Sequence, residues 1–176
     1  MKLGATVWFT GLPCSGKTTI SNYLFNILVS SGCKAELLDG DVVRQGISKG
    51  LGYSEADRRE NIRRIGSVAE QLTRSGLIVL VAAISPYRSA RDHLRKSIPN
   101  FIEVYINAPL AVCEKRDVKG LYHKARKGEL LHFTGVDAPY EPPLNPEVVC
   151  NTDREMVEES AMKIYECLRR IRIMGL

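Results

Sequence analysis

Eight residues near the N-terminus constrain the fold more than any other part of the sequence. The segment from Gly11 to Thr18 reads Gly-x-x-x-x-Gly-Lys-Thr and follows the apolar run Ala5–Thr10. This pattern is typical of a phosphate-binding loop when it lies between a strand and a helix, and both neighbours are predicted here. Its glycines let backbone N–H groups point at a phosphate, and the helix N-terminus adds partial positive charge. The sequence therefore predicts binding of a nucleoside triphosphate.

Two side chains of this loop have tasks of their own. Lys17 is expected to reach the β- and γ-phosphates, and the Thr18 hydroxyl is suited to ligating Mg²⁺. Cys14 stands at a variable position, where it is either a reactive thiol or a filler of that position. The residues predicted to hold the donor nucleotide are Gly11, Leu12, Pro13, Cys14, Ser15, Gly16, Lys17, Thr18 and Thr19.

Strand-like and helical segments alternate along the 176 residues. Apolar, β-rich runs predict strands at Ala5–Thr10, Ala35–Leu38, Leu77–Ile84, Phe101–Ile106 and Glu147–Cys150. Helical spacing of apolar residues predicts helices over Thr18–Ser31, Glu55–Ser75 and Asp153–Ile173, with Asp153 as a cap. Strands that are apolar throughout are typical of a parallel sheet covered on both faces. We expect an α/β fold with a parallel sheet of about five strands, in one domain spanning 1–176.

One region breaks this alternation. Lys119–Asn145 is rich in Gly, Pro and charged residues, and it is long for an ordinary connection. We predict a functional lid over approximately 119–145, with an irregular surface loop as the alternative.

Composition narrows the function classes. The net charge of +5 comes without a long Lys/Arg block, so nucleic-acid binding is not predicted. Five scattered cysteines without a CxxC pair predict no disulfide framework, and three histidines show no metal-ligand spacing. No stretch approaches the roughly 18 apolar residues that span a bilayer, and no signal-like region opens the chain. We expect a cytoplasmic protein without a membrane partner.

Two carboxylates follow the second predicted strand, in the segment Leu37–Asp41. Ligands collect at the carboxyl ends of parallel strands, so Asp39 and Asp41 are expected near the phosphates. One can hold Mg²⁺, and the other can accept a proton from an attacking hydroxyl. A turn followed by a helix cap is the alternative interpretation. No NKxD element follows, which disfavours a guanine-specific switch protein.

An arginine cluster comes next in the chain. Guanidinium groups grip oxyanions, so a cluster at this point favours an acceptor site for a doubly anionic small molecule. Arg44 and Arg58 are the candidates for that task. Ordinary solvated charge is the interpretation for Arg59, Arg63 and Arg64.

These motifs together carry a resemblance. The segments GLPCSGKTT, LDGDVVR, GYSEADRRENIRRIG, AAISPYRSAR, DVKGLYHKARKGEL and FTGVDAPYEPP occur in the order seen in adenylylsulfate kinases, from Thr10 to about Val149. The resemblance implies a P-loop NTPase fold like that of nucleoside monophosphate kinases, with ATP and Mg²⁺ as donor. It implies phosphorylation of the 3′-hydroxyl of adenosine 5′-phosphosulfate (APS) to 3′-phosphoadenylyl sulfate (PAPS), in sulfate assimilation. Dimers are common in that family, so a homodimer is expected.

The resemblance also implies residue roles. Asp39 resembles the metal-side carboxylate, and Asp41 the residue that orients or deprotonates the 3′-hydroxyl. Tyr53 stands where the family usually has Phe, and with Phe133 it would sandwich the acceptor adenine. The residues implied to hold the acceptor are Asp41, Arg44, Tyr53, Arg58, Asn61, Ile84, Ser85, Lys119 and Phe133.

Ser85 has competing interpretations. A phosphoserine intermediate at this serine has been assigned in the family, which makes Ser85 a candidate catalytic residue beside Lys17 and Asp41. Direct in-line transfer requires no such residue, because positioning and charge neutralisation suffice. Ser85 is otherwise a turn-forming hydroxyl or an acceptor contact.

Two other functions compete with this one. A related small kinase would act on gluconate, shikimate or a nucleoside, but the DGD, ISPYR and FTGVDAPYE segments speak against it. A nucleotide-binding regulatory module without turnover would show a damaged P-loop, whereas this P-loop is intact.

Overall fold

The computed structural model describes residues 4–171, with the side chain of Asp41 left out. In that part of the chain, one parallel sheet has the strand order β2-β3-β1-β4-β5. Its strands are β1 (Ala5–Thr10), β2 (Ala35–Asp39), β3 (Ile78–Ala82), β4 (Phe101–Asn107) and β5 (Val148–Asn151). The helices are α1 (Lys17–Ser30), α2 (Gly40–Gln45), α3 (Glu55–Arg74), α4 (Arg88–Ser97), α5 (Leu110–Arg116), α6 (Leu121–Arg126) and α7 (Val157–Arg170).

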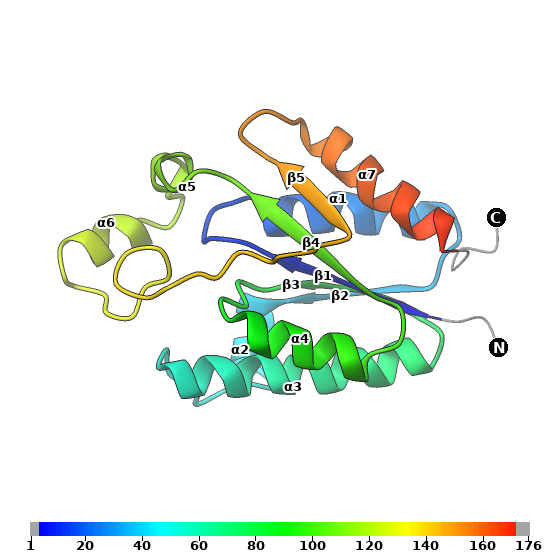
Figure 1. The fold of residues 1–176 in the computed structure, drawn as a ribbon, viewed down its shortest axis with the longest axis horizontal. Helices are drawn as coiled ribbons and strands as arrows, with labels where there is room; N and C mark the ends of the chain where they lie inside the picture. The colour runs from blue at the N-terminus through cyan, green and yellow to red at the C-terminus, as the bar shows by residue number, and fades with distance from the viewer. Residues whose placement is uncertain (1–3, 172–176) are drawn as a thin grey trace.

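Helices cover both faces of the sheet (Figure 1). Helices α1 and α7 pack together on one face, and α3 and α4 pack together on the other. Each face has its own buried apolar cluster, one around Leu24 and Ile164 and the other around Trp8 and Ile65. Because β1, β3 and most of β4 are buried on both faces, their sequences are largely apolar. The charged exception is Glu103 of β4, which pairs with the buried Arg91. The predicted five-stranded α/β fold is confirmed.

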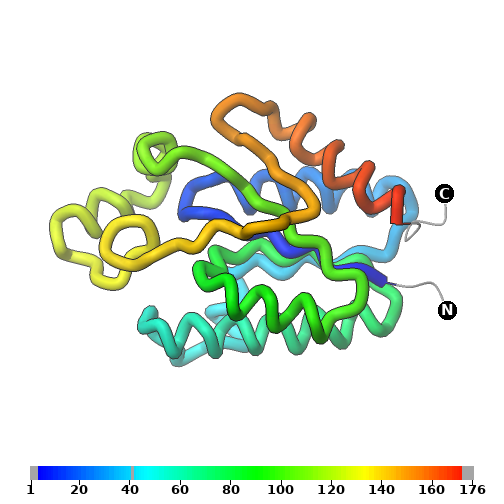
Figure 2. The backbone as a smooth tube through the Cα atoms, viewed as in Figure 1, coloured from blue at the N-terminus to red at the C-terminus, as the bar shows by residue number. Residues whose placement is uncertain are grey.

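The carboxyl ends of the strands meet at one edge of the sheet, as parallel pairing requires. Helices α5 and α6 extend beyond this edge (Figure 1). Figure 2 shows the chain after α6 forming a loop and then returning along the sheet to β5. The P-loop and this extension therefore lie at the same end of the molecule.

The extension contains more regular structure than its composition suggests. Helix α6 begins after Gly120, and Asp117 accepts hydrogen bonds from the backbone N–H groups of Tyr122 and His123. The loop after α6 is closed by Asp137, which accepts from the N–H groups of His132 and Phe133, both at 2.6 Å. Asp117 and Asp137 thus fix the backbone at the two ends of the segment that they enclose.

The helix bounds differ from the prediction at the C-terminal end. Helix α7 begins at Val157, and its first turn is held by Glu159, which accepts a hydrogen bond from the N–H of Met156. Asp153 lies in the preceding turn, so its predicted capping role is wrong. Ile173, the predicted end, lies outside the described residues. No helix within residues 4–171 combines the length and apolarity that crossing a bilayer requires.

Candidate active site

The P-loop is held by hydrogen bonds to its carbonyl groups. Lys17 Nζ donates to the carbonyls of Gly11 (2.9 Å) and Leu12 (2.6 Å). The carbonyl of Pro13 accepts from Tyr122 Oη at 3.1 Å, and that of Ser15 accepts from Thr152 Oγ1 at 2.7 Å. In a trans peptide the C=O and the following N–H point in opposite directions. The bonds to the Gly11, Pro13 and Ser15 carbonyls therefore fix the directions of the N–H groups that follow them, those of Leu12, Cys14 and Gly16.

Glycine is required at both ends of this loop. A Cβ on Gly11 would lie 2.4 Å from the carbonyl oxygen of Ile106, so no larger residue fits there. Gly16 has φ +109° at the N-cap of α1, a conformation that L side chains rarely adopt. The strand, loop and helix of the predicted P-loop are thus all present, and Gly16, Lys17, Thr18 and Thr19 line a cavity of about 660 Å³.

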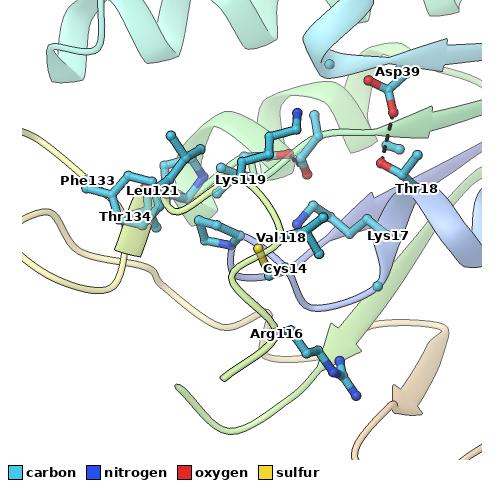
Figure 3. Close-up of a pocket in the computed structure, with 18 of the residues that line it drawn as sticks. Cys14, Lys17, Thr18, Asp39, Arg116, Val118, Lys119, Leu121, Phe133 and Thr134 are labelled. Carbon is cyan, nitrogen blue, oxygen red and sulfur yellow. Dashed lines mark hydrogen bonds between the residues drawn. The ribbon is translucent and has the colours of Figure 1, made fainter. Parts of the chain in front are cut away.

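The predicted metal-side residues lie together at the start of α1. Thr18 Oγ1 donates a hydrogen bond of 2.9 Å to Asp39 Oδ2 at the end of β2 (Figure 3). A hydroxyl and a carboxylate are hard oxygen ligands of the kind Mg²⁺ prefers, and Mg²⁺ commonly binds one or two carboxylates plus phosphate oxygens. The donor set therefore fits the predicted Mg²⁺. No cluster of three or more His, Cys, Asp or Glu able to hold a metal occurs in residues 4–171.

The two predicted anion-binding arginines flank Tyr53 in the same cavity. Arg44 lies over the Tyr53 ring at 4.4 Å and donates to the carbonyl of Gly52 at 3.0 Å. Arg58 donates to the carbonyls of Tyr53 and His132, so it joins α3 to the segment beyond α6. Burial lowers the pKa of Arg58 from its ordinary value. The other three arginines form ion pairs with glutamates of α3 or contacts outside the cavity, namely Arg59, Arg63 and Arg64.

Two buried polar atoms that line the cavity have no hydrogen-bond partner among the described residues. They are Oδ1 of Asn61, which the sequence predicted, and Oγ1 of Thr134, which it did not. Both side chains are nearly inaccessible, at 7% and 1% exposure. A buried polar atom without a partner is costly, so these two atoms mark places where a ligand would supply the missing bond.

Ser85 is buried and its hydroxyl is engaged on both sides. Its Oγ accepts from Trp8 Nε1 at 2.8 Å and donates to the carbonyl of Ala83 at 3.1 Å. The residue has φ +44°, an uncommon conformation for a serine. Arg91, which is buried against Glu103, donates to the Ser85 carbonyl at 2.5 Å and holds this turn. Ile84 and Ser85 both line the cavity.

The remaining wall comes from the extension beyond the sheet. Figure 3 shows Lys119, Leu121 and Phe133 on one side of the cavity and Lys17 and Thr18 on the other. The ring of Phe133 packs edge-to-face against Tyr122, with centroids 4.9 Å apart. Phe133 and Tyr53 line the same cavity, as the predicted sandwich requires. The backbone of Asp41 lies in α2, but its side chain is outside the described part of the structure.

Sequence reasoning missed the far end of the cavity. Arg116 at the end of α5 donates to the carbonyls of Ser15 and Thr152, and both Arg116 and Thr152 line the cavity. Thr152 directly follows β5, and ligands bind beyond the carboxyl ends of parallel strands. Its position after a predicted strand could therefore have identified it as a site residue. Arg116 gave no comparable signal because α5 was not predicted.

A family model described as adenylylsulphate kinase matches residues 3–151. The chain belongs to the adenylylsulfate kinase family. An adenylyl-sulfate kinase of Rippkaea orientalis (strain PCC 8801 / RF-1) is 60% identical over 168 residues, which cover 96% of this chain and 93% of that relative. The family resemblance expected from the motifs is therefore confirmed.

Solved structures agree with the family assignment. An APS kinase of Mycobacterium tuberculosis, in complex with AMPPNP and APS, matches with a TM-score of 0.92 and 45% identity, covering 96% of this chain and 99% of that one. A shikimate kinase of Aquifex aeolicus matches with a TM-score of 0.53 and 17% identity, covering 96% of this chain and 98% of that one. The second likeness shows the fold alone.

Proposed function

We infer that this chain is an adenylyl-sulfate kinase of sulfate assimilation, which uses ATP to phosphorylate the 3′-hydroxyl of APS and releases PAPS and ADP. The observation that carries this inference is a single cavity that joins the P-loop to Arg44, Arg58 and Asn61. Family membership and the 60% identical relative support the same reaction. Two anionic nucleotides can meet there, one against the P-loop and the other against the arginines.

The donor side would use a preorganised loop and the ammonium group of Lys17. Backbone N–H groups within Gly11–Thr19, where only Pro13 has none, would cradle the ATP phosphates. The bonds to the Pro13 and Ser15 carbonyls set the directions of the Cys14 and Gly16 N–H groups. Lys17 would exchange its bonds to the Gly11 and Leu12 carbonyls for phosphate oxygens. Thr152 and Arg116 at the far end of the cavity would border the donor base.

Thr18 and Asp39 would hold Mg²⁺ as ligands, either directly or through water. When bound, Mg²⁺ supplies neutralisation of the charge on the β- and γ-phosphates. The Thr18–Asp39 hydrogen bond already brings the two oxygens together. That prealignment supports the proposed metal site.

The acceptor side uses side chains from several segments. Arg44 and Arg58 would grip the phosphosulfate, and Asn61 Oδ1 would accept a bond from the ribose. Tyr53 and Phe133 would flank the adenine, while Ile84 and Ser85 form the floor. Thr134 Oγ1 would pair with a polar atom of the acceptor.

Asp41 is proposed to orient or deprotonate the 3′-hydroxyl. It lies two residues after Asp39, the end of β2, and one turn before Arg44 in α2, which supports a place near both substrates. Ser85 is proposed as a structural part of the acceptor wall, because Trp8 and the Ala83 carbonyl already engage its hydroxyl. In-line transfer would proceed directly between the nucleotides.

Further proposals concern organisation. The segment from about 119 to 145 would act as a lid of a single domain, with Lys119 closing over both nucleotides and excluding water. Its helix and closed loop support movement as a unit. The chain would act as a homodimer, as family resemblance suggests, in the cytoplasm where ATP is supplied.

The test is a transfer assay with radiolabelled ATP across several acceptors. APS is expected to give labelled PAPS, while gluconate, shikimate and adenosine give none. Label transferred to one of those acceptors and not to APS would overturn the inference. ATP binding without transfer to any acceptor would favour the regulatory-module alternative.

A further inference from the structure

Tyr122 contacts both the P-loop and Phe133, although it does not itself line the cavity. Its side chain is 2% exposed, and its hydroxyl donates to the Pro13 carbonyl of the P-loop at 3.1 Å. Its ring packs edge-to-face on Phe133 at an interplanar angle of 81°. One rigid side chain thus joins the donor loop to the aromatic wall of the acceptor side.

The bond to Pro13 acts on the phosphate cradle. The Pro13 carbonyl and the Cys14 N–H belong to one planar peptide unit and point in opposite directions. Cys14 has φ +59°, so this peptide sits in a turn that its own sequence does not favour. A donor on the carbonyl side therefore sets the direction of the Cys14 amide inside the loop.

The Phe133 side of the contact is equally constrained. Asp137 holds the N–H groups of His132 and Phe133, while Arg58 donates to the His132 carbonyl. Gly135 allows close packing there, since a Cβ on it would lie 3.1 Å from Leu12 of the P-loop. If Phe133 shifts when an adenine binds against it, the shift would therefore displace Tyr122.

Burial keeps the phenol in its donor form. Desolvation raises the pKa of Tyr122 above its ordinary value, so the hydroxyl stays protonated at neutral pH. The Tyr122 backbone N–H is held by Asp117, which fixes the base of the side chain. Ring, hydroxyl and backbone are therefore all tied to different parts of the site.

We propose that Tyr122 is a positioning residue that couples the two nucleotide sites: occupation of the acceptor side against Phe133 steadies the Pro13–Cys14 peptide and so strengthens binding of the donor phosphates. The proposal rests on the proposed function and adds to it a route between the substrates. Coupling of this kind is reciprocal, so ADP must strengthen APS binding by the same factor.

The experiment measures the dissociation constant of APS by calorimetry, with the protein alone and with the protein saturated with ADP and Mg²⁺. The ratio of the two constants is the coupling factor, expected to be about fivefold or more in the unchanged chain. Tyr122→Phe keeps the ring on Phe133 and removes only the bond to Pro13. It is expected to lower the coupling factor by about two- to twelvefold, the worth of one neutral hydrogen bond.

Tyr140→Phe is the matched control. Tyr140 is a half-buried tyrosine whose hydroxyl likewise makes a hydrogen bond, at 3.0 Å to Thr10 Oγ1, and it does not line the active-site cavity. It is expected to keep the coupling factor of the unchanged chain. If loss of the phenol hydroxyl had only a structural effect, both variants would have lower thermal stability. Neither variant would then have a lower coupling factor.

A second measurement needs no variant. In the unchanged chain, APS added alone is expected to slow amide hydrogen exchange in the peptide covering 11–16. An unaltered exchange rate there, or a coupling factor that Tyr122→Phe leaves unchanged, would overturn the proposal while the transfer assay still succeeds. Failure of the unchanged chain to bind APS would contradict the proposed function and this inference together.

Discussion

The proposed donor and acceptor sides of the cavity are built in different ways. The donor side is centred on one contiguous loop between β1 and α1, whose carbonyls accept hydrogen bonds from Lys17 of the same loop and from Tyr122 of α6. The acceptor side combines side chains from α2, α3, the turn after β3 and the extension beyond α5. Its segments are held by tertiary bonds such as Arg58 to His132. The donor loop can therefore be recognised from its sequence motif, whereas the acceptor side is assembled only when distant segments come together in the fold.

The largest effect is expected from Lys17→Ala, which attacks the donor side. The ammonium group is the one loop cation able to reach the transferred phosphoryl group, and no other loop residue replaces it. Turnover is expected to fall by about 100-fold or more, the usual cost of losing one group that stabilises transition-state charge. Initial rates of PAPS formation measure this. Turnover near that of the unchanged chain would contradict the role given to Lys17.

Arg58→Lys tests the acceptor side with the charge preserved. Lysine lacks the planar fork that reaches the carbonyls of both Tyr53 and His132. The kcat/KM for APS is expected to fall about 10- to 100-fold, while the KM for ATP changes little. Arg63→Lys is the control, because Arg63 pairs with Glu60 on the exposed surface of α3 and does not line the cavity. An equal loss of kcat/KM for APS and for ATP would contradict the distinction between the donor and acceptor sides.

Asp137→Asn tests how the acceptor wall is held. The N–H groups of His132 and Phe133 lower the pKa of Asp137 below its ordinary value of 3.8, so the folded state favours the ionised form. This contribution to stability is present above pH 3.8 and is lost as the pH falls through the lower, folded-state pKa.

The variant is therefore expected to melt at a lower temperature than the unchanged chain at pH 7, with the gap narrowing below pH 3.8. The KM for APS is expected to rise by about tenfold at most, and kcat to change less. Thermal melts across pH and steady-state kinetics measure the two effects. A melting-temperature gap independent of pH would show that the carboxylate charge is not what holds the loop.

Ser85→Ala is expected to have the smallest effect. The hydroxyl is buried between Trp8 and the Ala83 carbonyl, so its loss removes wall contacts and no reacting group. PAPS formation is expected to fall a few-fold at most, and no label from radiolabelled ATP is expected to remain on either protein. If Ser85→Ala abolished transfer and the unchanged chain retained label, the result would support a phosphoserine intermediate.

The sheet and the P-loop were predictable because their signals are local. β1, β3 and β4 are largely apolar since both faces are covered, and the loop glycines are required by backbone geometry. Helix α4 gave no such signal. Its buried positions include Arg91, which is neutralised by Glu103 in the core and looks like a surface residue in the sequence.

The missed site residues share one physical reason. Arg116 and Thr152 owe their places to bonds with the Ser15 carbonyl, which lies far from both in the sequence. Thr134 is next to the predicted Phe133, but its unpaired hydroxyl is visible only once the buried surroundings are known. Side chains positioned by distant backbone groups leave no periodic or spacing pattern.

The indole of Trp8 carries a practical consequence. The chain has one tryptophan, and its N–H is bonded to Ser85 at the floor of the cavity. Tryptophan emission therefore comes from a single reporter bonded to a residue of the proposed acceptor wall, and titration with APS is expected to be measurable optically without any label. Each variant described above can be compared on that same built-in signal.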